Sequence, residues 1–191
     1  MSTLSRREVL GLLAAAGAHA QTRLPANVGL KADTGPPRSE CGVGALLPWA
    51  DALWAVTYNS HKAATGTGLG LYRIDETLAA ERVHVHNGTH ANRMVHKESS
   101  QAFIGPYAID TKGNWRVIEA LLDHRLTATM RHLTDPAGRV YFLTMEGLLF
   151  ELDVNTLQPA LAANLVKELG INARPHFKGG YTAGGRVVVA N

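Results

Sequence analysis

The chain has 191 residues, of which 46% are apolar and 18% charged, a balance that fits one folded domain and excludes a disordered, collagen-like or coiled-coil protein. A single cysteine excludes a disulfide framework and a cysteine-rich zinc module. The net charge of +3 is too small to indicate a nucleic-acid partner, and no apolar run of about 18 residues predicts a membrane span.

Residues 1–20 have the three parts of an export signal. Arg6 and Arg7 form a basic start, a short apolar stretch follows, and residues 18–20 read Ala-His-Ala, which is an A-x-A cleavage pattern. The arginine pair is typical of the twin-arginine route, so the sequence predicts a periplasmic or secreted protein. The alternative is an amphipathic N-terminal helix. Residues 21–41 contain three prolines and no apolar period, which predicts a leader segment.

Residues 42–191 are predicted to form short β-strands separated by turns. Four segments look equivalent, because each is apolar and follows a polar or glycine-containing turn: residues 53–58, 101–104, 139–144 and 186–189. A further strand follows three of them, at residues 70–75, 107–110 and 147–153.

The spacing of these segments indicates a repeat. With Ala52, Gln101, Arg139 and Arg186 as equivalent starts, the separations are 49, 38 and 47 residues. A period in the forties with several strands per repeat is typical of a β-propeller, in which each repeat forms one blade. The predicted fold class is therefore all-β, with three to four blades of a larger ring, and an eight-stranded sandwich is the alternative. Because the fourth repeat reaches only its second strand at Asn191, we expect the protein to continue beyond it.

Two other patterns concern the connections between strands. Residues 158–169, followed by Gly170, have the composition of a helix, and we expect this helix to link two blades. Asp75, Asp110 and Asp153 occupy the same place in successive repeats, which predicts a structural role. The sequence therefore does not support a hydrolase that works with two carboxylates.

Histidines and cations recur where the innermost strands of the later blades are expected. They are His90, Arg93, Arg131, His132, His176 and Lys178. Innermost strands line the central channel, so these side chains are expected to converge on a funnel that suits an anionic ligand, such as a carboxylated or sulfated sugar. The alternative is that they form hydrogen bonds within the scaffold.

The loop that contains His61 and Lys62 joins two strands of the first repeat and is rich in glycine. Its glycines are not a dinucleotide fingerprint, because a strand and not a helix follows them. A long loop with histidine beside lysine is a reasonable catalytic position, and a flexible hairpin loop is the alternative.

His84 and His86 are two residues apart on a strand and face the same way, so with His90 and His96 they could hold a metal such as zinc. No acidic residue or cysteine stands at a familiar ligand spacing, and scattered surface histidines are the favoured interpretation. No cofactor is predicted, and a structural metal ion remains open.

The chain resembles the bacterial seven-bladed β-propeller enzymes that act on uronate-containing polysaccharides. These are the ulvan lyases, the rhamnosyl-glucuronate lyases and the hydrolase relatives that release terminal rhamnose from glucuronate. The resemblance rests on residues 57–62 with the glycine-rich loop that follows, and on residues 88–94, 127–132 and 175–180. It covers residues 42–191, the first half of such a propeller, and implies a seven-bladed ring that is monomeric when complete.

The resemblance also implies roles for the candidate residues. A lyase neutralises a uronate carboxylate, removes the adjacent C5 proton and protonates the leaving oxygen, and a histidine can serve as the base. Cations would bind the carboxylate: Lys62, Arg93, Arg131 and Lys178. Histidines would do the catalysis, with His61 or His90 as base, His132 or His176 as acid or carboxylate ligand, and His61 acting in a rhamnose-releasing enzyme.

Two further functions stay open. The protein can be a non-catalytic exported propeller that binds an anionic glycan or a protein partner, because such a protein needs the basic funnel but no positioned base. A quinone or metal dehydrogenase propeller is disfavoured because its cofactor motifs are missing.

Overall fold

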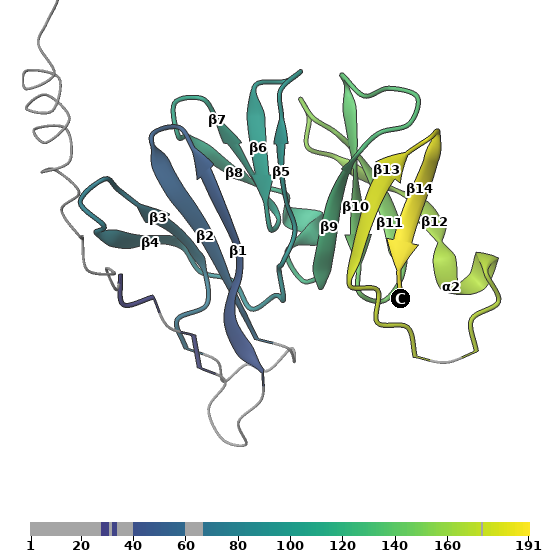
Figure 1. Ribbon diagram of the computed structural model, residues 1–191, viewed down its shortest axis with the longest axis horizontal. Coiled ribbons are helices and arrows are strands. Elements are labelled where there is room, and N and C mark those ends of the chain that lie inside the picture. The colour runs from purple at the N-terminus through teal and green to yellow at the C-terminus, as the bar shows by residue number, and fades with distance from the viewer. Residues whose placement is uncertain (1–27, 31, 34–39, 60–66, 173) are drawn as a thin grey trace, which may run out of the picture.

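The computed structural model describes residues 28–30, 32–33, 40–59, 67–172 and 174–191 (Figure 1). The predicted signal peptide, most of the predicted leader segment and the loop with His61 and Lys62 lie outside the described residues. No helix within the described ranges is both long and apolar enough to cross a bilayer.

The strands form a series of antiparallel meanders in chain order. The first sheet contains β1 (Cys41–Trp49), β2 (Ala52–Asn59), β3 (Leu71–Ile74) and β4 (Ala80–His84). The second contains β5 (Arg93–His96), β6 (Gln101–Ile104), β7 (Tyr107–Asp110) and β8 (Trp115–Val117), and a 3₁₀ turn at Glu119–Leu121 follows it. The third contains β9 (Leu126–Arg131), β10 (Arg139–Thr144), β11 (Leu148–Asp153) and β12 (Pro159–Asn164). After α2 (Leu165–Glu168), β13 (Gly179–Ala183) and β14 (Arg186–Ala190) form a hairpin.

This arrangement confirms the predicted all-β, partial propeller fold. The second strands β2, β6, β10 and β14 begin at the four positions that the sequence predicts as equivalent. Figure 1 shows the sheets standing side by side in chain order, and the first strands β1, β5, β9 and β13 contact one another in succession. Separate four-stranded meanders exclude the sandwich alternative.

The hydrophobic core lies between neighbouring sheets. In β6, Ala102 and Ile104 pack toward the first sheet, whereas Phe103 packs toward the third, where its ring meets Phe142 edge to face at 5.9 Å. Strand β10 repeats this alternation. Val140 and Phe142 pack toward the second sheet, and Tyr141 and Leu143 pack toward the β13–β14 hairpin. A middle strand buried on both faces is apolar throughout, which is why these segments stand out in the sequence.

The recurring aspartates have the structural role that the sequence predicts. Each lies at or just after the end of a third strand and accepts main-chain N–H groups with Oδ1: Asp75 from Thr77 and Ala79, Asp110 from Lys112 and Asn114, and Asp153 from Asn155 and Thr156, all at 2.8–3.0 Å. These turns direct the chain into the fourth strand. For Asp153, the N–H donors of Thr156 and Asn155 hold the pKa of the carboxyl below its ordinary value.

The predicted helix over residues 158–169 is wrong for its first half. Residues Pro159–Asn164 form the outer strand β12, which pairs with β11, and the helix is confined to the single turn α2. The turn at Asp153, with Leu157 in the left-handed region at φ 57°, returns the chain so that Pro159 lies opposite Leu152. The alanine and leucine residues favour a helix locally, but the free edge of β11 offers a ladder of hydrogen bonds that overrides this preference.

Asp153→Ala should lower the melting temperature by about 2–4 °C, because two turn N–H groups lose their acceptor. Asp153→Asn is the matched control, since its amide oxygen can accept the same bonds, and it should melt close to the unsubstituted protein. Thermal unfolding followed by circular dichroism measures both. Equal losses in the two variants would show that the turn geometry does not depend on the acceptor.

Candidate functional site

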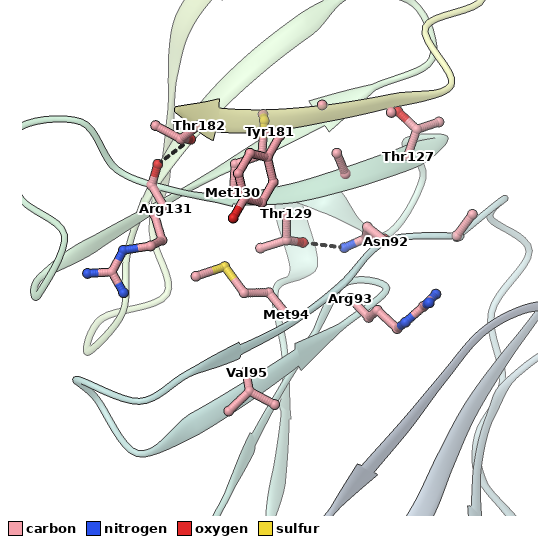
Figure 2. Close-up of a pocket in the computed structure, with 14 residues that line it drawn as sticks. Asn92, Arg93, Met94, Val95, Thr127, Thr129, Met130, Arg131, Tyr181 and Thr182 are labelled. Atoms are coloured by element: carbon pink, nitrogen blue, oxygen red, sulfur yellow. Dashed lines mark hydrogen bonds between the residues drawn. The ribbon is translucent and has the colours of Figure 1, made fainter. Parts of the chain in front are cut away.

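A pocket of about 470 Å³ opens where the first strands of three successive sheets lie side by side. It is lined by residues 91–95, which lead into and form most of β5, by residues 127–131 from β9 and by residues 179–182 from β13 (Figure 2). In a propeller the first strands face the central channel, so this pocket occupies the position that the sequence analysis predicts for the funnel.

Alternation along β9 places polar groups in the pocket. Ala128 and Met130 belong to the core between the third sheet and the hairpin, so Thr127, Thr129 and Arg131 face the opposite way. Bonds between neighbouring sheets hold this row in place. Asn92 Nδ2 donates to Thr129 Oγ1 at 2.8 Å, and Thr182 Oγ1 donates to the carbonyl oxygen of Arg131 at 2.7 Å.

Two arginines lie at opposite ends of the pocket. Figure 2 shows the side chains of Arg93 and Arg131 pointing to opposite sides, with Thr129 and Met94 between them. Arg131 pairs with Glu98, Nη2 to Oε1 at 2.5 Å. Arg93 is exposed and has no ion pair with any other part of the chain that the structure describes.

Apolar surface lies between these ends. Tyr181 is 72% exposed, and its ring projects into the pocket close to Met130 and Thr129 (Figure 2). Met94 is half-buried on the facing strand β5. An exposed aromatic face beside methionine side chains and threonine hydroxyls can contact both the C–H face and the hydroxyl groups of a sugar ring.

Of the eight candidate residues, the structure brings Arg93 and Arg131 together around the pocket. His90 precedes β5 and is fully buried, His132 follows β9, and His176 and Lys178 are exposed residues before β13. These four are not among the residues that line the pocket, and His61 and Lys62 lie outside the described residues.

His132 anchors the turn between β9 and β10. Its Nδ1 accepts the N–H groups of Thr134 and Asp135, at 3.3 and 3.0 Å, and its ring stacks on Tyr141 with centroids 4.4 Å apart. Because Nδ1 accepts, Nε2 carries the proton and donates to Glu151 Oε2 at 3.2 Å. Both ring nitrogens are thus engaged in the scaffold.

His86 and His90 form a buried pair, with ring centroids 4.5 Å apart. None of their four ring nitrogens has a partner with hydrogen-bond geometry among the described residues. Burial lowers the pKa of His86 to about 4, with the neighbouring His84 as a smaller cause. Burial also holds the pKa of His90 well below its ordinary value, and the nearby His86 and His124 act in the same direction. Both rings are therefore neutral at physiological pH.

The four histidines weighed for a metal site do not form one cluster. His84 Nδ1 lies 3.0 Å from the hydroxyl of Tyr107, whereas His96 contacts Ser99 and the carbonyl oxygen of Pro136. Within the described ranges, no group of three or more histidine, cysteine or acidic residues could hold a metal ion. The favoured interpretation of surface histidines is also wrong, because His86, His90 and His96 are buried.

Sequence reasoning missed the groups that give the pocket its chemical character, namely Thr129, Met94, Tyr181 and the pairing partner Glu98. The spacing of Thr127, Thr129 and Arg131 at every second position is the signal that could have found the polar row, because it marks one face of a strand. No sequence signal indicates that Glu98 pairs with Arg131, because the pair joins two different sheets.

No family model and no curated protein matches the chain. Among solved structures, the chain is similar to the extracellular domain of a B. thetaiotaomicron protein assigned to the hybrid two-component systems. The identity is 10%, the TM-score is 0.42, and the match covers 72% of this chain and 17% of the other.

Acid should destabilise the protein in a window set by the buried histidine pair. His86 has a pKa of about 4 when folded and an ordinary value of 6.5, so the unfolded chain binds more protons between these pH values. The contribution of His86 to the free energy of unfolding is therefore fully present above pH 6.5. Protonation of His86 alone lowers this free energy by about 3 kcal/mol as the pH drops to about 4. The turn aspartates act at lower pH, because their pKa values lie below 3.8.

Urea unfolding between pH 7.5 and 4 measures this loss. His86→Gln removes one of the two buried titrating groups and should make the free energy of unfolding depend less steeply on pH. His176→Gln, at an exposed position, should leave this dependence unchanged. An equally steep dependence in His86→Gln would assign the acid sensitivity to other groups.

Proposed function

We propose that the protein is exported and that the pocket between β5, β9 and β13 binds an anionic carbohydrate. The observation that carries this proposal is the composition of the pocket. Two arginines, a row of threonine and asparagine groups and an exposed tyrosine come from three successive sheets, and no carboxylate is among the lining residues. A concave site with an arginine at each end and hydroxyl groups between them suits an anion that carries many hydroxyl groups.

The size and the polarity of the site agree with a sugar ligand. A volume of about 470 Å³ lies within the range of small-molecule sites. Thr129 and Thr182 offer hydroxyl groups, while Tyr181 and Met94 offer apolar surface to ring C–H groups. Arg93 supplies the positive charge that a carboxylate or sulfate group requires.

Cleavage of the bound glycan is the second candidate function, and the phenol of Tyr181 inside the pocket favours it. β-Elimination next to a uronate needs a proton donor for the leaving oxygen as well as a base, and a tyrosine hydroxyl can donate. The resemblance to uronate-acting propellers assigns the base to His61 or His90, and the roles of His61, His90, His132 and His176 stay predictions. Rhamnose release from glucuronate is the corresponding hydrolytic reaction.

Arg93→Ala should weaken binding of an acidic oligosaccharide by about 10-fold or more, because a charge-assisted hydrogen bond is lost. Isothermal titration calorimetry with a glucuronate-containing oligosaccharide measures the change. Arg82→Ala is the matched control, since Arg82 is an exposed arginine on the outer strand β4, and its affinity should not change. Equal affinities of Arg93→Ala and Arg82→Ala would place the anion elsewhere.

The catalytic candidate is tested with ulvan and with rhamnose-capped glucuronate glycans. Ultraviolet absorbance from unsaturated uronate indicates a lyase, and free rhamnose without absorbance indicates a hydrolase. In either case, His61→Ala should reduce turnover by at least about 100-fold if His61 is the acid or base. If neither product forms from either glycan, the result supports binding without cleavage. An unchanged rate in His61→Ala would show that His61 is not the acid or base.

A further inference from the structure

Glu98 belongs to the turn between β5 and β6, yet it contacts the end of β9 in the next sheet. Its Oε1 lies 2.5 Å from Arg131 Nη2, and its Oε2 lies 3.7 Å from His96 Nε2. His96 is itself fixed, because Nδ1 contacts Ser99 Oγ at 2.7 Å and Nε2 contacts the carbonyl oxygen of Pro136 at 2.8 Å. The carboxylate of Glu98 is therefore held beside Arg131, a residue that lines the pocket.

This contact makes the two arginines of the pocket unequal. The charge of Arg131 is balanced by Glu98 at one end, whereas Arg93 at the other end has no carboxylate partner in the described ranges. The pKa of Glu98 lies below its ordinary value, because its own main-chain N–H and the Arg131 side chain stabilise the ionised form. Glu98 is thus negative at neutral pH, and the local charge is near zero at the Arg131 end and positive at the Arg93 end.

We infer that Glu98 determines which anions the pocket accepts: a ligand with one anionic group, held at Arg93, is favoured, and a second anionic group at the Arg131 end is disfavoured. This inference rests on the proposed function, since it specifies the ligand class of the same pocket. The physical reason is that a second anion either meets the carboxylate of Glu98 or has to displace it from Arg131.

The pair acts on selectivity more than on stability. The side chains of Arg131 and Glu98 are 51% and 29% exposed, and ion pairs this accessible to water contribute little to folding. The contact of His96 Nε2 with the carbonyl oxygen of Pro136 also joins the second and third sheets, and it does not depend on Glu98. Glu98→Gln should therefore fold normally and keep a side chain of nearly the same size.

Reaction with phenylglyoxal, which labels arginine, tests the charge pairing without any glycan. In the unsubstituted protein, peptide mass spectrometry should find Arg93 labelled faster than Arg131. Glu98→Gln should raise the labelling rate of Arg131 several-fold and leave Arg93 unchanged. The matched control is Glu146→Gln, which removes the partner of Arg125, also paired at 2.5 Å, and should change the labelling of Arg125 alone. An unchanged rate at Arg131 in Glu98→Gln would overturn the inference.

Binding of two acidic disaccharides then tests the selectivity. One disaccharide carries a single uronate and the other carries two, so they differ in charge but not in length. Glu98→Gln should bind the doubly charged disaccharide about 10-fold more tightly than the unsubstituted protein does, with little change for the singly charged one.

The outcomes separate the inference from the proposed function. An equal gain for both disaccharides, or no gain for either, overturns the selectivity of Glu98 while the pocket remains an anion-binding site. A failure of both disaccharides to bind either protein overturns the proposed function and, with it, the inference that rests on it.

Discussion

The structure depends on middle strands that are buried on both faces. Phe103 and Ala102 are neighbours in β6 but pack into different clusters, and Phe142 and Leu143 do the same in β10. A strand of this kind is stable only between two other sheets, because water on either side would expose large apolar side chains. Stacking the sheets in this way brings their first strands into a row, and the pocket is formed on that row.

Several buried or half-buried polar side chains serve the same stacking. Trp49 Nε1 donates to main-chain carbonyl oxygens of the second sheet, including that of Asp110 at 2.8 Å, and Gln101 Nε2 donates to the carbonyl oxygen of Val154 at 3.0 Å in the third. These bonds fix the register between sheets that hydrophobic packing alone would leave less defined. The ring nitrogens of His86 and His90 stand apart from this pattern, because their burial is not compensated by bonds of comparable geometry.

The sequence predicted the repeat better than the site, for a physical reason. A strand start is a local feature, so the apolar runs after turns located β2, β6, β10 and β14, and the equivalent aspartates located the turns. Residues 159–164 form a strand and not a helix because they pair with the free edge of β11, and the local sequence does not show this edge. The pocket combines residues about 90 positions apart. The sequence grouped Arg93 and Arg131 among the expected channel residues, and both line the pocket, but it could not indicate that Tyr181 lies there too.

Because the pocket wall is made from three sheets, several side chains proposed to contact a ligand also join neighbouring sheets. Asn92 bonds to Thr129, Thr182 to Arg131 and Glu98 to Arg131, and each of these contacts bridges neighbouring sheets. A bound sugar that accepts from Thr129 or Arg131 would therefore meet groups whose positions are already fixed, which reduces the entropy lost on binding. The same bridges explain how the pocket keeps its charge asymmetry. Glu98 lies in a turn of the second sheet and Arg131 at the end of β9 in the third. The stacking of these two sheets therefore fixes the position of the ion pair at the Arg131 end of the pocket.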